Sequence, residues 1–282
     1  MVDYINDFLE NLKKIRRSEK TIKMYKYILK NFYNYVGDIN PNDVVYENFE
    51  DFLYKDNIVD TTINLRINAI KSFYKFLENK KIISENHAYQ KIKHIKVNQK
   101  IIEYFNTSEI RSLKRIIGKH NISLKAKTII TFILNTGVRN EELCNLKKSD
   151  IDLRTGKIEI IKGKGNKDRT IYVRDSVIRT LRKYYNDTLF FDYKSEYVFP
   201  GTSGRRLRER ELNRMFERVS QEIKIHIYPH KLRHTFITQL ADKNVPLSKI
   251  AFWVGHDSTK TTERYIHITG IDIESIAKQI TI

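Results

Sequence analysis

Apolar residues recur every three or four positions through the first third of the chain, which is the spacing of one face of an α-helix. One such stripe runs from Tyr4 to Ile15. Ser18 is placed to cap a second helix, whose apolar face runs from Ile22 to Phe32, because a serine oxygen accepts a backbone N–H at a helix start. The pattern therefore predicts two consecutive amphipathic helices.

Two more helices are predicted before residue 80. Pro41 interrupts the pattern ahead of a short helix near residues 49–53, and a fourth apolar stripe runs from Ile63 to Leu77. The sequence predicts an all-helical module.

The rest of the chain combines helices with a small sheet. Residues 124–137 predict a buried helix that ends at Gly137, and residues 157–173 alternate as two short strands joined by a glycine-rich turn. The other expected features are a helix cap at Thr107 or Ser108, helices near 175–186 and 208–222, and a short strand at 197–199. The predicted fold class is mainly α with a small β-sheet (α+β).

The chain of 282 residues is long enough for two domains that each bury a core. We expect a helical domain at residues 1–83. Residues 84–105 lack a helical or strand period and contain several lysines, which predicts a basic linker. The second domain is expected at 106–282. It ends in a tail, 271–282, whose isoleucines recur on one helical face and must dock on the same subunit or on another.

The charge of the chain favours an acidic partner. Lysine and arginine number 52 against 34 aspartates and glutamates, a net charge of +18, and nucleic acid is the first candidate. A solvated helix face explains each basic residue of the first half alone, whereas together they can follow a phosphate backbone. The candidate DNA contacts are Lys23, Lys26, Lys30, Arg66, Lys71, Lys75, Lys93 and Lys96.

Cysteine content and hydropathy bear on the compartment. Cys144 is the one cysteine, which excludes an intramolecular disulfide and fits a reducing environment. Polar residues interrupt the N-terminal apolar positions, so no secretory signal is predicted. No apolar run approaches the roughly 20 residues needed to cross a bilayer. We expect a soluble, cytoplasmic protein without a membrane partner.

Candidate chemistry is concentrated in residues 226–267, which contain five of the eight histidines. His230 and Arg233 form a His-x-x-Arg motif, and Tyr265 follows His256 by nine residues. Arginine binds two phosphate oxygens in a bidentate fork, imidazole transfers protons, and a phenol oxygen can attack phosphorus. Each residue alone is more often structural, but together they favour phosphodiester chemistry.

A metal site is not expected in this stretch. His230 and His234 are spaced i, i+4, as in a zinc-binding helix. A zinc protease, however, has its catalytic glutamate directly after the first histidine, and here that residue is Lys231. The sequence also shows no carboxylate cluster suited to a two-metal nuclease. Fixed cations would then stabilise the developing charge.

Two upstream segments can add cations to the same site. Arg139 follows the helix stop at Gly137, so it is expected to open the next helix and reach out from a rigid scaffold. Glu142, one turn later, can brace its guanidinium, although a solvated carboxylate is the alternative. Lys164 is expected at the tip of the strand hairpin.

Four segments, TGVRNEEL, GKGNKDR, PHKLRHTF and VGHDSTKTTERY, together resemble the tyrosine recombinases, and most closely the Xer site-specific recombinases. The resemblance implies a helical core-binding domain of the SAM-like type and a catalytic domain that form a clamp around DNA. It also implies cleavage through a 3′-phosphotyrosyl intermediate, without metal, ATP or any other cofactor. The catalytic residues implied are Arg139, Lys164 (or Lys167), His230, Arg233, His256 and the nucleophile Tyr265, supported by Glu142.

The implied partner is double-stranded DNA at a specific recombination site. The implied assembly is a homotetramer on two sites, formed from a monomer or dimer. Resolution of chromosome dimers is the function expected from the Xer likeness. The alternatives are integration or excision of a mobile element, a type IB-like topoisomerase, and a DNA-binding protein without catalytic activity.

Overall fold

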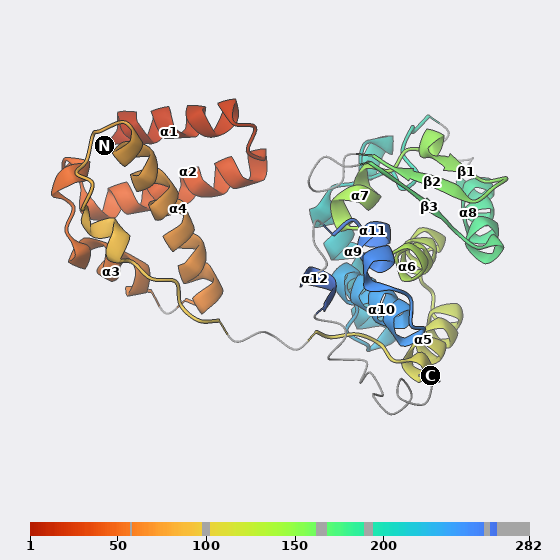
Figure 1. Ribbon diagram of the computed structural model, residues 1–282. Coiled ribbons are helices and arrows are strands. Elements are labelled where there is room, and N and C mark those ends of the chain that lie inside the picture. Colours follow the sequence, from red (N-terminus) through yellow and green to blue (C-terminus); the bar gives the residue numbers. More distant parts are fainter. Residues whose placement is uncertain (57, 98–101, 162–167, 189–193, 257–259, 264–282) are drawn as a thin grey trace, which may run out of the picture. The chain divides into compact units, whose positions relative to one another are not determined.

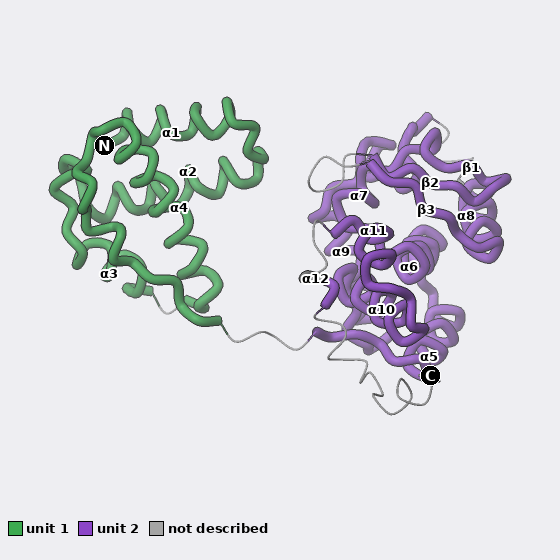
Figure 2. The backbone as a smooth tube through the Cα atoms, viewed as in Figure 1, with its two compact units in different colours: residues 1–100 green, residues 101–282 purple. Residues whose placement is uncertain are grey.

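The computed structural model describes residues 1–56, 58–97, 102–161, 168–188, 194–256 and 260–263. The chain divides into two compact units, residues 1–100 and 101–282 (Figure 2). Helices dominate both units, and the described strands all lie in the second (Figure 1). The predicted class, mainly α with a small sheet, is confirmed.

The first unit is a helical bundle. Its elements are α1 (Val2–Lys14), α2 (Glu19–Val36), the 3₁₀ turn η1 (Pro41–Asp43), α3 (Tyr46–Tyr54), α4 (Asp60–Asn79) and the 3₁₀ turn η2 (Ala88–Lys91). The predicted cap of α2 is confirmed, since Ser18 Oγ accepts the Thr21 amide at 3.1 Å. Buried rings fill the centre of the bundle, among them Phe32 stacked on Phe49 at 5.5 Å.

The stretch that follows α4 packs on this bundle. Tyr89 is 6% exposed and Ile92 is 3% exposed, and both belong to the core of the first unit. His87 Nε2 lies 3.0 Å from the carbonyl oxygen of Pro41. The beginning of the expected linker, 84–105, is therefore not a free connection. Hydrophobic periodicity did not predict this packing, because an irregular backbone buries single side chains without a regular spacing.

The first helix of the second unit begins at a capping box. Asn106 Oδ1 accepts the Glu109 amide at 2.9 Å, and Glu109 Oε2 accepts the Asn106 amide at 2.7 Å. The cap expected at Thr107 or Ser108 was therefore placed too late. The helices are α5 (Thr107–Lys119), α6 (Leu124–Thr136), α7 (Asn140–Asn145), α8 (Asp175–Thr188), α9 (Glu209–Ile223), α10 (Pro229–Asp242), α11 (Leu247–Val254) and α12 (Lys260–Glu263), with 3₁₀ turns η3 (Lys148–Asp150) and η4 (Thr202–Gly204).

A three-stranded antiparallel sheet of order β1-β2-β3 lies beside α8 (Figure 1). Its strands are β1 (Ile151–Asp152), β2 (Lys157–Ile160) and β3 (Arg169–Tyr172). Ile158 pairs with Ile171, both buried, which confirms the two strands predicted for the hairpin. The strand expected at 197–199 is wrong. Tyr197 makes one isolated bridge, with Lys147. The residues after Lys147 form the 3₁₀ turn η3, so the pairing does not continue into a strand.

The junction between α6 and α7 positions the first candidate arginine. Gly137 ends α6 in the left-handed region, with φ +62°, and a Cβ there would overlap the ring of Phe236. Glycine meets both requirements. Arg139 then occupies the N-cap position of α7, as predicted. Across the described residues, no helix is both long and apolar enough to span a bilayer.

Candidate active site

Three arginines from distant parts of the chain donate to the end of α11. The bonds run from Arg169 Nε to Trp253 O at 2.7 Å, from Arg233 Nη2 to Val254 O at 2.7 Å, and from Arg139 Nη2 to Gly255 O. The last carbonyls of a helix lack intrahelical partners and carry the negative end of its dipole. The end of α11 is therefore a natural acceptor for three cations.

Glu142 of α7 joins two of these arginines. Its carboxylate accepts Nη1 and Nη2 of Arg169, each at 2.8 Å, together with Nη1 of Arg139 at 3.0 Å and the Arg139 amide at 2.8 Å. Its side chain is 2% exposed. Burial raises the pKa of Glu142, but hydrogen bonds and charge from Arg169, and then from Arg139, outweigh it and bring the pKa to about 2. The carboxylate is therefore ionised, and the predicted contact with Arg139 is present.

Arg169 was missed as a site residue. It lies in the quoted segment GKGNKDR, yet the sequence pattern gave it no role. A signal was available, because β3 alternates and Arg169 shares its buried face with Ile171. An arginine on the inner face of a strand requires a buried counter-ion.

Arg233 lies on the buried side of α10 and is 5% exposed. Besides Val254 O it donates from Nη1 to the carbonyl of Gly137. It therefore ties the end of α6 to the end of α11. That carbonyl lies two residues before Arg139, so Arg139 and Arg233 approach the same region from different helices.

His230 lies in the first turn of α10, with its ring 6.3 Å from that of His234. The pKa of His230 is lowered, first by desolvation and then by the charge of Arg233, while Glu209 opposes the shift. The imidazole is therefore neutral at pH 7, and a neutral ring can accept a proton.

His256 follows the αL glycine that ends α11. A Cβ on Gly255, whose φ is +68°, would lie 2.8 Å from Arg169 Nη1 and 3.0 Å from Arg139 Nη1, so only glycine leaves room for both guanidiniums. Desolvation, then the charges of Arg233 and Arg139, lower the pKa of His256 to about 4. Its Nδ1 lies 2.8 Å from the hydroxyl of Thr262 in α12.

Comparison with known proteins now places this geometry in a family. Residues 103–270 match the Phage integrase family, and residues 5–81 match the N-terminal SAM-like domain of phage integrases. A tyrosine recombinase of Thermosipho africanus is 33% identical over 95% of each chain. This chain belongs to the tyrosine recombinases. The family comprises site-specific DNA recombinases that act through a phosphotyrosine intermediate without ATP or metal.

Two further relatives carry Xer names. Tyrosine recombinase XerA of Thermococcus kodakarensis is 28% identical, over 95% of this chain and 91% of its own. The crystal structure of XerH site-specific recombinase bound to its palindromic difH substrate, a post-cleavage complex, superposes with a TM-score of 0.74 at 23% identity. The match covers 91% of this recombinase and 78% of that chain and shows a shared fold.

Several predicted residues of this recombinase are not part of the described structure. Lys164, Lys167 and Tyr265 lie outside the described residues, as does the tail 271–282. The structure therefore brings together Arg139, Arg233 and His256, with His230 on the helix that carries Arg233. Within the described ranges no group of three metal-ligating side chains occurs.

The candidate DNA contacts of the first unit differ in exposure and in their protein partners. Most are exposed, namely Lys23, Lys26, Lys30, Lys75, Lys93 and Lys96, whereas Lys71 is half-buried. Arg66 differs. It donates to the carbonyl of Phe52 at 2.9 Å and to Asp56 at 2.7 Å, and it stacks over the Phe52 ring. These contacts explain Arg66 as a structural link between α3 and α4.

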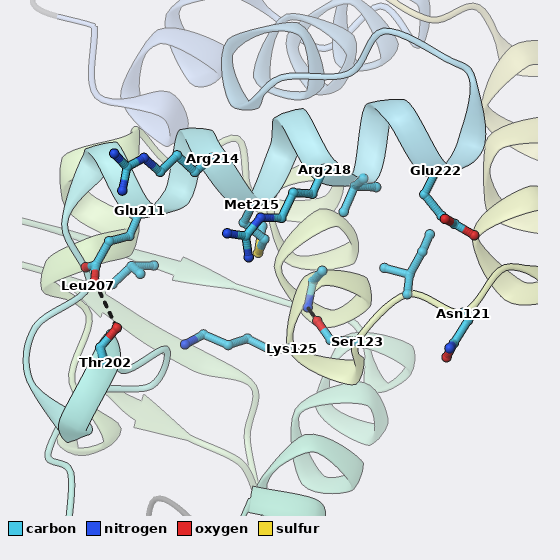
Figure 3. Close-up of a pocket in the computed structure, with 14 residues that line it drawn as sticks. Asn121, Ser123, Lys125, Thr202, Leu207, Glu211, Arg214, Met215, Arg218 and Glu222 are labelled. Carbon is cyan, nitrogen blue, oxygen red and sulfur yellow. Dashed lines mark hydrogen bonds between the residues drawn. The ribbon is translucent and has the colours of Figure 1, made fainter.

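Two hollows flank α9. One, of about 740 Å³, is lined by His230 together with Asn140 and Asn213, and so lies beside the candidate site. The other, of about 570 Å³, holds none of the candidate catalytic residues. Figure 3 shows Arg214 and Arg218 above it on α9 and Lys125 below it on α6. Glu211 and Glu222 of α9 also line it, and Lys125 donates to the carbonyl of Pro200.

Proposed function

We propose that this protein is a Xer-type site-specific recombinase that cuts and rejoins DNA through a 3′-phosphotyrosyl bond to Tyr265. The observation that carries the proposal is the convergence of Arg139, Arg233 and His256 on the end of α11. The relative named XerA, matched over nearly the whole chain, supports the Xer branch. Resolution of chromosome dimers is the role we assign within that branch.

In the proposed reaction the scissile phosphate is held by Arg139 and Arg233. Tyr265 Oη attacks phosphorus, an Oη–P bond forms, and the bond from phosphorus to the 5′-oxygen breaks. Lys164 gives a proton to the departing 5′-oxygen. The transition state concentrates negative charge on the non-bridging oxygens, where two fixed guanidiniums stabilise it more than the ground state. The phosphotyrosyl bond conserves the energy of the phosphodiester for rejoining.

The two histidines supply a proton acceptor. A tyrosine phenol has an unperturbed pKa near 10, so attack requires that its proton be removed. His230 and His256 are both neutral at pH 7, since desolvation and nearby arginines lower the pKa of each. With Nδ1 of His256 facing Thr262, we assign Nε2 to the substrate. One imidazole accepts the phenol proton and the other hydrogen-bonds a phosphate oxygen.

The proposed partner is double-stranded DNA at a specific site, bound by both units. The exposed lysines of α2 and α4 would neutralise phosphates of the duplex. We further propose a homotetramer on two sites, in a cytoplasmic setting, with the tail of each subunit docked on its neighbour.

Trapping on genomic DNA tests the proposal. Covalent adducts are isolated, and the cleavage position is mapped. Two copies of the mapped site are then placed in a supercoiled plasmid. Resolution that depends on the site supports a recombinase, and a single adduct position near the replication terminus supports dimer resolution. Adducts at the ends of a mobile element would assign integration or excision instead. Relaxation of plasmids without the site would indicate a topoisomerase, and retardation without any adduct would indicate a DNA-binding protein.

A further inference from the structure

We infer that Arg169 is a positioning residue for DNA cleavage. Through Glu142 and the carbonyl of Trp253 it holds Arg139 and the end of α11 in the geometry that cleavage requires. The inference rests on the proposed function, and it assigns a role to a side chain that the candidate catalytic set does not contain.

Arg169 is built into the protein and does not face a ligand. Its side chain is 4% exposed. All three of its nitrogens donate to protein acceptors, Nη1 and Nη2 to the two oxygens of Glu142 and Nε to Trp253 O. A planar guanidinium is the side chain that can satisfy this fork and a third acceptor at once. Because its fork is filled by the buried carboxylate of Glu142, we assign Arg169 a role through other residues and not a contact with DNA.

The first connection runs through Glu142 to Arg139. The Glu142 carboxylate binds both guanidiniums, and each of its oxygens accepts a bond from Arg169. Without Arg169 the carboxylate keeps its two bonds from Arg139, those of the amide and of Nη1, and loses the other two, which anchor it to β3. Arg139, which is 19% exposed and is the proposed phosphate ligand, would then be held by a less firmly fixed carboxylate.

The second connection runs through α11 to His256. Nε of Arg169 donates to the carbonyl of Trp253, three residues before His256. Nη1 of Arg169 and Nη1 of Arg139 both lie close to Gly255. Loss of the bond to Trp253 frees one of the three anchored carbonyls at the helix end. Because Arg139 and His256 both depend on this end, one side chain fixes two members of the candidate site.

The position of Arg169 in the chain adds a third connection. It is the first residue of β3 and follows Lys164 by five residues. β3 is therefore fastened at its first residue to α7 and α11. A substitution at Arg169 therefore disturbs the described elements that carry Arg139 and His256, at a position five residues after Lys164 in the sequence.

The test measures the rate of covalent adduct formation on a nicked duplex that carries the mapped site. The variants are Arg169→Met, Arg169→Lys, and the double variant Glu142→Met with Arg169→Met. The control is Arg182→Met, which removes an exposed guanidinium that donates to one carbonyl, that of Leu153, in the same unit. Thermal unfolding and duplex affinity are recorded for each. Absence of any adduct with the wild-type chain would refute the proposed function itself.

We expect Arg169→Met to bind DNA normally and to cleave about 100-fold more slowly, the cost of a misplacement of roughly 1 Å. Arg169→Lys keeps the charge without the fork and is expected to cleave about tenfold more slowly. The double variant removes the unpaired buried charge, so its stability recovers, because apolar residues of similar volume replace a buried ion pair well. Its cleavage stays slow, because Arg139 still lacks a brace.

Two results would overturn the inference. One is wild-type cleavage by Arg169→Lys. The other is recovery of cleavage along with stability in the double variant, which would show that Arg169 only neutralises Glu142. If Arg169→Met does not fold, the lysine variant and the double variant still decide. The control is expected to cleave at the wild-type rate.

Discussion

Replacing Glu142 with glutamine should destabilise the second unit strongly. Glutamine has nearly the same shape as glutamate, but it carries no charge and turns an NH₂ group toward the arginine donors. The pKa of Glu142 is displaced from 4.5 to about 2, which at about 1.4 kcal/mol per pH unit gives about 3 kcal/mol in favour of the ionised form. The loss of one partner from a buried ion pair typically costs about 3–5 kcal/mol, in agreement with this value.

Calorimetry at pH 7.5 measures the effect. For a unit of this size, each kcal/mol lowers Tm by about 2–4 °C, so Glu142→Gln should lower the transition of the second unit by about 6–12 °C. The matched control is Glu141→Gln, the same chemical change at the preceding, exposed residue of α7. The transition of the first unit should not move in either variant.

The reasoning fails if Glu142→Gln unfolds within about 2 °C of the Glu141 control. That result would mean that the two guanidiniums find other acceptors at no cost. Arg139 and Arg169 already donate to carbonyls at the end of α11, so these carbonyls are the acceptors to which the two guanidiniums would turn.

Four further predictions concern chemistry, pH, salt and assembly. Tyr265→Phe should bind DNA normally and form no adduct, because only the attacking oxygen is lost; a persisting 3′-linked adduct would identify another nucleophile. The pKa of His256 is about 4 in the folded chain against an ordinary value of 6.5, so the unfolded chain takes up the proton first as pH falls. Its contribution to stability is present above pH 6.5 and is lost toward pH 4, and His256→Gln should flatten the fall of Tm between these values. Duplex affinity should drop steeply between 50 and 200 mM salt, by about 10³-fold or more if six or more phosphates are contacted, and a flat profile in a titration would argue against DNA as the main partner. A chain that ends at Gly270 should fold and bind one site but synapse poorly, and wild-type plasmid resolution by that chain would exclude the tail as the link between subunits.

Sequence alone determined most of the local structure. The stripes that predict α1, α2 and α4, the Ser18 cap and the stop at Gly137 all depend on residues within a turn or two of one another. Such information is complete in any short window of the chain. The four ordered motifs identified the family for a related reason, since their residue types and order are properties of the chain itself.

The tertiary structure decided how the site is held together. Arg169 bonds Trp253 across 84 positions, and Arg139 bonds Gly255 across 116. A periodic pattern does not show which group a buried guanidinium binds. From the sequence, Arg169 was therefore not distinguished from the other basic residues of the chain. The packing of Tyr89 and Ile92 on the first unit was hidden for the same reason. Periodicity shows which side of a helix or strand is buried, whereas only the folded chain shows which distant group lies against it.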